Sequence, residues 1–179
     1  MFKPITLSIL LIILGIFSEL QPHVLWVAVA LSLAVCVELL VAFQKIGKRA
    51  AFVMTLIMFI CYSKSFWLQL EGGLSWWLPA LLFASAVIVF FLMLPRLDSI
   101  VFPVLMMGLV LVQLCWAATQ LCLSEPVFGH QLACAGAYLF ALSALLGAGN
   151  AKQNNKANKN NLVSGSYLLA HSLIVASVL

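Results

Sequence analysis

Glu38 is the residue that most directly raises a question of chemistry. It lies about five residues before the end of an apolar run at 23–43. A carboxylate inside a membrane helix costs a few kcal/mol unless it faces protein or water. Ala30, Ala34, Glu38 and Ala42 recur every four residues, so they form one stripe of small residues on a helix. The stripe predicts that the carboxylate points into a helix bundle.

Four further polar side chains are expected within the same bundle, on three other helices. They are Tyr62, Ser143, Tyr167 and His171. With a helical rise of about 1.5 Å per residue, Glu38, Ser143 and Tyr167 lie roughly 8–9 Å and His171 roughly 15 Å from one membrane edge, with Tyr62 near mid-membrane. This arrangement predicts a membrane-embedded pocket. The alternative is structural, because Glu38 and His171 could serve as hydrogen-bonding packing residues and the tyrosines as core residues.

The composition indicates an integral membrane protein. Of the 179 residues, 65% are hydrophobic and 8% charged, whereas a soluble domain has about 25% charged residues. The net charge of +4 is spread over short loops and does not predict nucleic-acid binding. The five cysteines show no Cys-x-x-Cys spacing, so we expect small packing residues and no metal, disulfide or cofactor.

Seven apolar runs predict a single all-α domain, a polytopic transmembrane bundle over residues 1–179. A spanning helix needs roughly 20 apolar residues. The runs cover about 4–20, 23–43, 50–69, 74–95, 99–123, 128–149 and 161–179, with a polar cytoplasmic linker at 150–161.

The loop charges predict the orientation of this bundle. With seven helices, the basic residues that lie outside the apolar runs all fall on one side. They are Lys3, Lys45, Lys48, Arg49, Arg96, Lys152, Lys156 and Lys159, with Asp98 beside Arg96. Glu19, Glu71 and Glu125 fall on the other, where most of the tryptophans also gather. Short cytoplasmic loops are rich in Lys and Arg. We therefore expect a cytoplasmic N-terminus and an outer C-terminus.

Short motifs along nearly the whole chain carry a family likeness. They are the Lys3-Pro4 opening, the segment 31–38 that is similar to Ser-Leu-Leu-Gly-Asp, the segment 136–144 that is similar to Gly-Ala-x-Leu-Phe-x-x-Ser-Asp, and the ending Tyr167–His171 that is similar to Tyr-x-x-Ala-His. In these motifs the chain resembles the YhhN family of membrane proteins, whose characterised relatives are lysoplasmalogenases. Tyr62 matches the tyrosine of a family His-x-x-Tyr motif.

Three positions depart from the family pattern. The aspartate of the Gly-Asp motif is replaced by Glu38 or by Cys36, depending on where a gap falls. Phe59 stands at the family's histidine, and Ala144 stands at the aspartate of the Ser-Asp motif.

The resemblance implies hydrolysis of the vinyl ether bond of lysoplasmalogen-like lysolipids to a fatty aldehyde and a glycerophospho-headgroup. A general acid must protonate the vinyl ether carbon, and water must add to the resulting oxocarbenium ion. The resemblance implies Glu38 as the acid and His171 as the residue that orients or deprotonates water. Tyr62, Ser143 and Tyr167 are then the substrate-binding residues.

The three departures leave an alternative, a catalytically degenerate membrane protein that binds lipid or a protein partner. The expected partners are the bilayer and a membrane lipid or lysolipid, without nucleic acid. The expected location is the bacterial inner membrane. The oligomeric state is open.

Overall fold

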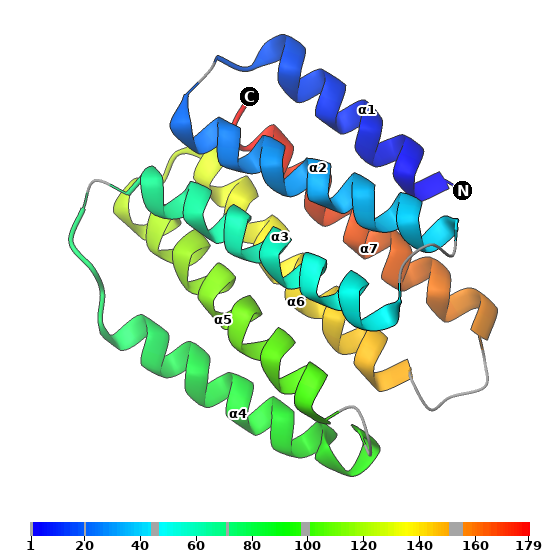
Figure 1. Ribbon diagram of the computed structural model, residues 1–179. Helices are drawn as coiled ribbons and strands as arrows, with labels where there is room; N and C mark the ends of the chain where they lie inside the picture. Colours follow the sequence, from blue (N-terminus) through cyan, green and yellow to red (C-terminus); the bar gives the residue numbers. More distant parts are fainter. Residues whose placement is uncertain (1, 20, 44–46, 71, 98–100, 151–155) are drawn as a thin grey trace.

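The structure is a computed structural model that describes residues 2–19, 21–43, 47–70, 72–97, 101–150 and 156–179. Among these residues the fold consists of helices and their connections. The helices are α1 (Phe2–Phe17), α2 (Pro22–Ala42), α3 (Lys48–Leu68), α4 (Trp77–Leu97), α5 (Val101–Ser124), α6 (Phe128–Asn150) and α7 (Lys156–Ala176) (Figure 1). The predicted all-α class and its seven helices are confirmed. The predicted bounds agree within three residues, except at the start of α7.

The last helix begins earlier than the apolar pattern predicted. We expected a polar linker over 150–161, but α7 starts at Lys156 and α6 continues to Asn150. Adding one residue to an existing helix costs little, because each new residue gains a backbone hydrogen bond. The polar segment before Asn161 therefore extends the packed helix by about one turn. Residues 151–155 of the linker, together with Lys45, Glu71 and Asp98, lie outside the described residues.

Prolines lie within the first three residues of four helices, at Pro4, Pro22, Pro79 and Pro103. Pro22 is the first residue of α2 and follows Gln21, whose backbone is extended. Pro103 is the third residue of α5. The first backbone N–H groups of a helix have no partner inside it, so a proline loses no hydrogen bond at these positions.

Five helices, α2 to α6, are long and apolar enough to cross a membrane, with mean hydropathies from 1.6 to 2.6 among the described residues. The apolar parts of α1 and α7 are shorter, at Phe2–Phe17 and Asn161–Ala176. Large apolar side chains also cover the outside of the bundle; Phe91 and Leu92 on α4 are 63% and 73% exposed. Such a surface requires a lipid environment, so the chain is an integral membrane protein.

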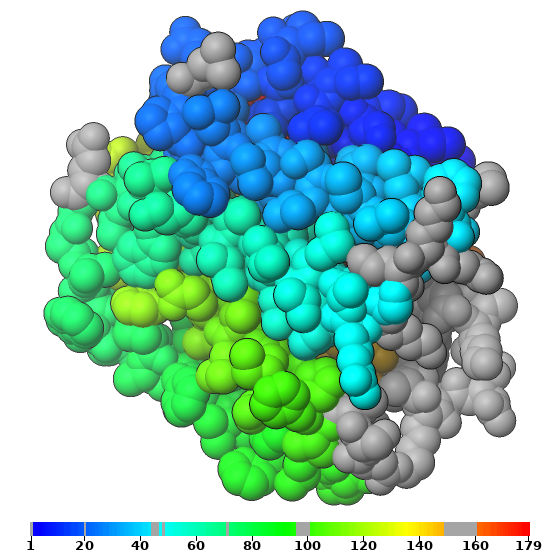
Figure 2. Space-filling view, in the orientation of Figure 1, coloured from blue at the N-terminus to red at the C-terminus, as the bar shows by residue number. Residues whose placement is uncertain are grey.

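Six of the helices close into a ring. Each helix of the ring packs against the next, in the order α1, α2, α3, α5, α6 and α7, and α7 packs against α1 (Figure 1). The fourth helix lies outside this ring, mainly against α5. A space-filling view shows α1, α2 and α3 packed side by side across one face (Figure 2). The interior is filled by fully buried side chains that include Tyr62, Phe66, Leu114 and Phe140.

A glycine permits close packing of α6 against α7. A Cβ atom on Gly136 would lie 2.8 Å from Ile174 Cγ1 and 3.0 Å from the Ala170 carbonyl oxygen. Small residues let membrane helices approach in this way. Gly136 therefore fixes how α6 and α7 present the side chains that face the interior.

The orientation in the membrane remains a prediction with a direct test. Trp26, Trp67 and Trp77 lie near one end of the bundle, and Trp67 stacks on Trp116 with ring centroids 5.0 Å apart. We expect a reporter enzyme that works only outside the cytoplasm to be active when it is fused after Leu179, because the sequence predicts that the basic loops fall on the other side of the membrane. A fusion before Lys3 should report the cytoplasm. A cytoplasmic signal at the C-terminus would contradict the predicted orientation.

Candidate functional site

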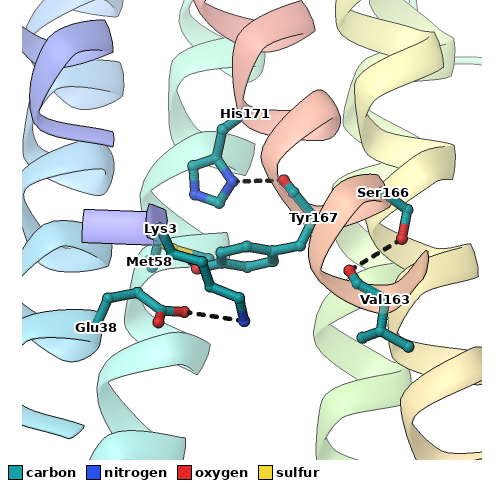
Figure 3. A network of polar contacts seen from close by, with 7 residues as sticks. All are labelled: Lys3, Glu38, Met58, Val163, Ser166, Tyr167 and His171. Carbon is teal, nitrogen blue, oxygen red and sulfur yellow. Dashed lines mark hydrogen bonds and ion pairs between the residues drawn. The ribbon is translucent and has the colours of Figure 1, made fainter. Parts of the chain in front are cut away.

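An ion pair joins α1 to α2 near one end of the ring. Lys3 Nζ lies 3.8 Å from Glu38 Oε1 (Figure 3). Their side chains are 35% and 21% exposed, so the pair is partly open to its surroundings. Glu38 thus faces the first helix, next to a cation. The small-residue stripe is buried at Ala30 and Ala34, whereas Ala42 is exposed at the helix end.

Tyr167 connects this ion pair to the interior. Lys3 Nζ lies 5.6 Å from the centre of the Tyr167 ring, within the range of a cation–π interaction. The Tyr167 hydroxyl donates to Met58 Sδ on α3 at 3.9 Å. In Figure 3, Lys3 and Tyr167 point toward one another, with Glu38 on the far side of the lysine. The side chains of α1, α2, α3 and α7 therefore meet at this point.

His171 lies one turn further along α7 and is fully buried. Its Nδ1 lies 3.0 Å from the Tyr167 carbonyl oxygen (Figure 3). A carbonyl oxygen only accepts, so Nδ1 carries the proton of this hydrogen bond, and in the neutral ring Nε2 is an acceptor. Nε2 is buried and has no hydrogen-bond partner among the described residues. The imidazole thus presents a lone pair to the interior.

Tyr62 on α3 faces the same imidazole. Their ring centroids are 5.8 Å apart in an edge-to-face arrangement. The Tyr62 side chain is fully buried, and its hydroxyl also lacks a hydrogen-bond partner within the described part of the chain. A buried polar atom without a partner costs about 1–3 kcal/mol. Two such atoms on facing rings make this pair a candidate functional site.

Aromatic rings surround these two polar atoms. Phe140 on α6 lies 4.7 Å from His171, 5.7 Å from Tyr167 and 5.9 Å from Tyr62, between ring centroids. Tyr167 and His171 are 4.4 Å apart. Phe59 stacks edge-on against Phe140 at 5.0 Å. The faces of aromatic rings are electron-rich, so the cluster suits a transient positive charge.

The hydroxyl of Ser143 makes its hydrogen bond within its own helix and not to the rings of this cluster. Ser143 is buried on α6, and its hydroxyl donates to the Phe140 carbonyl oxygen at 3.0 Å, one turn back on its own helix. Its predicted contact with substrate stays a prediction. The structure instead brings Phe140, from the same motif, into the centre of the cluster.

We call Glu38, Lys3, Tyr167, His171 and Tyr62 the polar chain. It runs from a partly exposed ion pair to two fully buried rings. Sequence reasoning named four of these residues but missed Lys3. The signal was available, because the predicted topology places Lys3 and Glu38 at the same end of the bundle. Among the described residues, no three metal-ligating side chains gather.

The ion pair gives a prediction about stability. We expect the double-mutant cycle of Lys3→Met and Glu38→Gln to show a coupling of about 1 kcal/mol, because partly exposed pairs seldom contribute more. The single changes should each lower the melting temperature in detergent, and the double change should lower it by less than their sum. Strictly additive shifts would mean that the pair does not form in the folded protein.

The comparisons with known proteins point to one family. The sequence model of the YhhN family matches residues 1–178, essentially the whole chain. No curated protein matches the chain, and no solved structure does.

Proposed function

Since the chain belongs to the YhhN family, we propose that it hydrolyses the vinyl ether bond of lysoplasmalogen-like lysolipids inside the bacterial inner membrane. The observation that carries this proposal is the pair of buried, unpartnered atoms, His171 Nε2 and the Tyr62 hydroxyl, next to an ion pair. A site for water addition needs an acceptor and a donor that the protein does not use itself. A lipid substrate also reaches a membrane-embedded site without leaving the bilayer.

Headgroup binding is the role we propose for Lys3 and Tyr167. An ammonium group binds phosphate strongly as a point charge. Lys3 is partly exposed near the end of the bundle, where a lysolipid phosphate would lie. Its interaction with that phosphate competes with the ion pair to Glu38. Binding of the phosphate thus frees the Glu38 carboxyl group from the ammonium group, and the reaction that we propose uses the protonated carboxyl group.

Protonated Glu38 is then the general acid. It gives its proton to the double-bonded carbon that does not carry the ether oxygen. The double bond's electron pair forms the new C–H bond, and the ether-linked carbon becomes an oxocarbenium ion. Tyr167 and Phe140 lie edge-on to His171 with centroids 4.4 and 4.7 Å away. Their electron-rich faces support the transient cation.

Water addition completes the reaction at His171. Nε2 accepts a proton from the attacking water, and the Tyr62 hydroxyl holds that water by a hydrogen bond. The oxygen bonds to the ether-linked carbon and forms a hemiacetal. The hemiacetal collapses to a fatty aldehyde, and the ether oxygen leaves with the glycerophospho-headgroup as a hydroxyl. His171 returns its proton to that oxygen, and the hemiacetal hydroxyl gives its proton to the Glu38 carboxylate. Both groups are restored, and one water is consumed for each bond cleaved.

A second candidate function is lipid binding without hydrolysis. Phe59 and Ala144 occupy positions where the family motifs have a histidine and an aspartate. Phe59 is 3% exposed and packs against Phe140, so an apolar ring stands at the histidine position. The same aromatic cluster would then hold part of a lipid without reacting with it.

A comparison of two substrates separates these candidates. Purified protein in detergent is mixed with a 1-alkenyl lysophospholipid or with its 1-acyl counterpart, and fatty aldehyde and fatty acid are measured. The hydrolase proposal expects aldehyde from the alkenyl lipid and no fatty acid from the acyl lipid. Binding of both lipids with release of neither product would support the second candidate.

A further inference from the structure

An apolar groove lies on the other side of α6 from the polar chain. Its volume is about 480 Å³, which is within the usual range for small-molecule sites. Most of its wall comes from α4, α5 and α6, including Leu82, Met93, Pro103, Cys115, Tyr138 and Ala148. Because α4 lies outside the ring of six helices, the groove opens along the junction between this outer helix and the ring.

The sixth helix separates the groove from the polar chain. Ala141 and Ala144 line the groove, whereas Phe140 and Ser143 on the same helix are buried in the interior. The groove walls are almost wholly apolar; the hydroxyl of Tyr138 is already bonded to Thr119 at 3.1 Å. An apolar cavity of this kind does not bind water well. Its occupant must therefore come from the hydrocarbon of the bilayer or from another apolar surface.

The length of the groove identifies the occupant. Its lining runs from Leu82 to Met93 on α4, from Pro103 to Cys115 on α5 and from Tyr138 to Ala148 on α6. At a rise of about 1.5 Å per residue, each stretch is roughly 15–18 Å long. One leaflet provides about half of a hydrocarbon core that is roughly 30 Å thick. The groove is thus as long as one lipid chain of a single leaflet.

The groove also lies in a definite half of the bundle. One end of its lining approaches the C-terminal ends of α4 and α6 and the N-terminal end of α5. The ion pair of Lys3 and Glu38 lies at that same end, near the N-terminus of α1 and the C-terminus of α2 (Figure 1). The other end of the groove reaches Tyr138, about halfway along α6.

We propose that this groove binds one hydrocarbon chain of a phospholipid from the leaflet on the Glu38 side. The site is separate from the polar chain and holds no carboxylate, histidine, lysine or arginine among its described lining residues. Its ligand is therefore a bound lipid and not the reacting substrate. Small side chains such as Gly108 and Ala141 make room for the chain, and Met93 and Met107 can adapt to its shape.

Photolabelling in vesicles tests this site. The protein is reconstituted in phosphatidylcholine vesicles that contain a diacyl phosphatidylcholine with a diazirine at the end of one acyl chain. The chain end lies at mid-membrane, so we expect labelled peptides around Leu82, Leu111 and Tyr138. This probe has no vinyl ether bond, so its labelling does not depend on the proposed hydrolysis.

Two matched glycine variants distinguish the groove from the general lipid surface. A Cβ atom on Gly108 or on Gly15 would meet nothing within 4 Å, so a side chain can be added at both positions without a clash at its first carbon. Only Gly108 lines the groove. We expect Gly108→Leu to reduce labelling of the groove peptides severalfold and Gly15→Leu to leave it unchanged. Equal labelling in both variants would overturn the proposal. Cross-links between two copies of the protein at the groove residues would also overturn the proposal, because they would identify a second copy as the occupant.

Discussion

Tyr62→Phe is expected to lower the rate of vinyl ether hydrolysis by about 100-fold or more while leaving the protein as stable as before. The change removes only a hydroxyl that is buried and lacks a hydrogen-bond partner among the described residues. The ring, which packs 5.9 Å from Phe140 and 5.8 Å from His171, is kept. Removal of an unpaired buried polar atom should not destabilise the fold and can even stabilise it.

The combination of two readouts makes this prediction specific. The rate is measured as aldehyde release from a 1-alkenyl lysophospholipid, and stability as the melting temperature in the same detergent. If Tyr62 had only a structural role, the Tyr62→Phe protein would not lose much activity while it stayed as stable as the wild type. An unchanged rate in a folded Tyr62→Phe protein would remove the hydroxyl from the mechanism.

His171→Phe provides the companion measurement. The ring stays among its aromatic neighbours, but the lone pair of Nε2 is lost. The lost hydrogen bond from Nδ1 to the Tyr167 carbonyl oxygen gives a small stability penalty of about 1 kcal/mol. Loss of a general base typically lowers a rate by about 10²–10⁴-fold. A rate loss no larger than the fall in folded protein would assign His171 a packing role.

Gly136→Val is expected to destabilise the protein by about 3 kcal/mol, the largest stability effect that we predict for one added side chain. Even the first added carbon would lie 2.8 Å from Ile174 Cγ1 and 3.0 Å from a backbone oxygen of Ala170. The backbone oxygen cannot move aside without shifting α7. Separation of α6 from α7 would also move Phe140 away from His171, so activity should fall as well.

Gly165→Val is the matched control for this effect. Gly165 lies on α7, and a Cβ atom there would meet nothing within 4 Å. Valine should change stability there by only a few tenths of a kcal/mol, since its helix propensity is slightly better than that of glycine. Both variants are compared by thermal unfolding in detergent. Similar melting temperatures for the two would contradict the close packing of α6 on α7.

Much of the fold could be predicted because membrane helices appear in the sequence as long apolar runs. Five of the apolar runs form helices long enough to span hydrocarbon among the described residues, and a helix is the structure that satisfies the backbone there. The start of α7 could not be read in this way. The residues before Asn161 are polar and carry no apolar signal, so their helical state depends on extension from the packed part of α7.

The sequence predicts how deep each site residue lies along its helix, and the site could be predicted only from these depths. Depth placed Glu38, Tyr167 and His171 in one half of the bundle. In the structure Lys3 links Glu38 to Tyr167, and Tyr167 in turn contacts His171. Depth does not tell which way a side chain turns around its helix. Ser143 has a depth similar to that of Tyr167, yet its hydroxyl bonds back to Phe140. The groove beside α4 has no sequence signal, because its apolar lining resembles any lipid-facing surface.

Aldehyde release by the wild-type protein and by Glu38→Gln tests the central claim most directly. Glutamine keeps the size of the side chain but cannot give the proton that the vinyl ether carbon requires. The wild-type protein should release fatty aldehyde and glycerophospho-headgroup in equal amounts, and Glu38→Gln should be slower by about 10²-fold or more. No aldehyde from the folded wild-type protein would contradict the hydrolase proposal, and equal rates in both proteins would contradict the role of Glu38 as the acid.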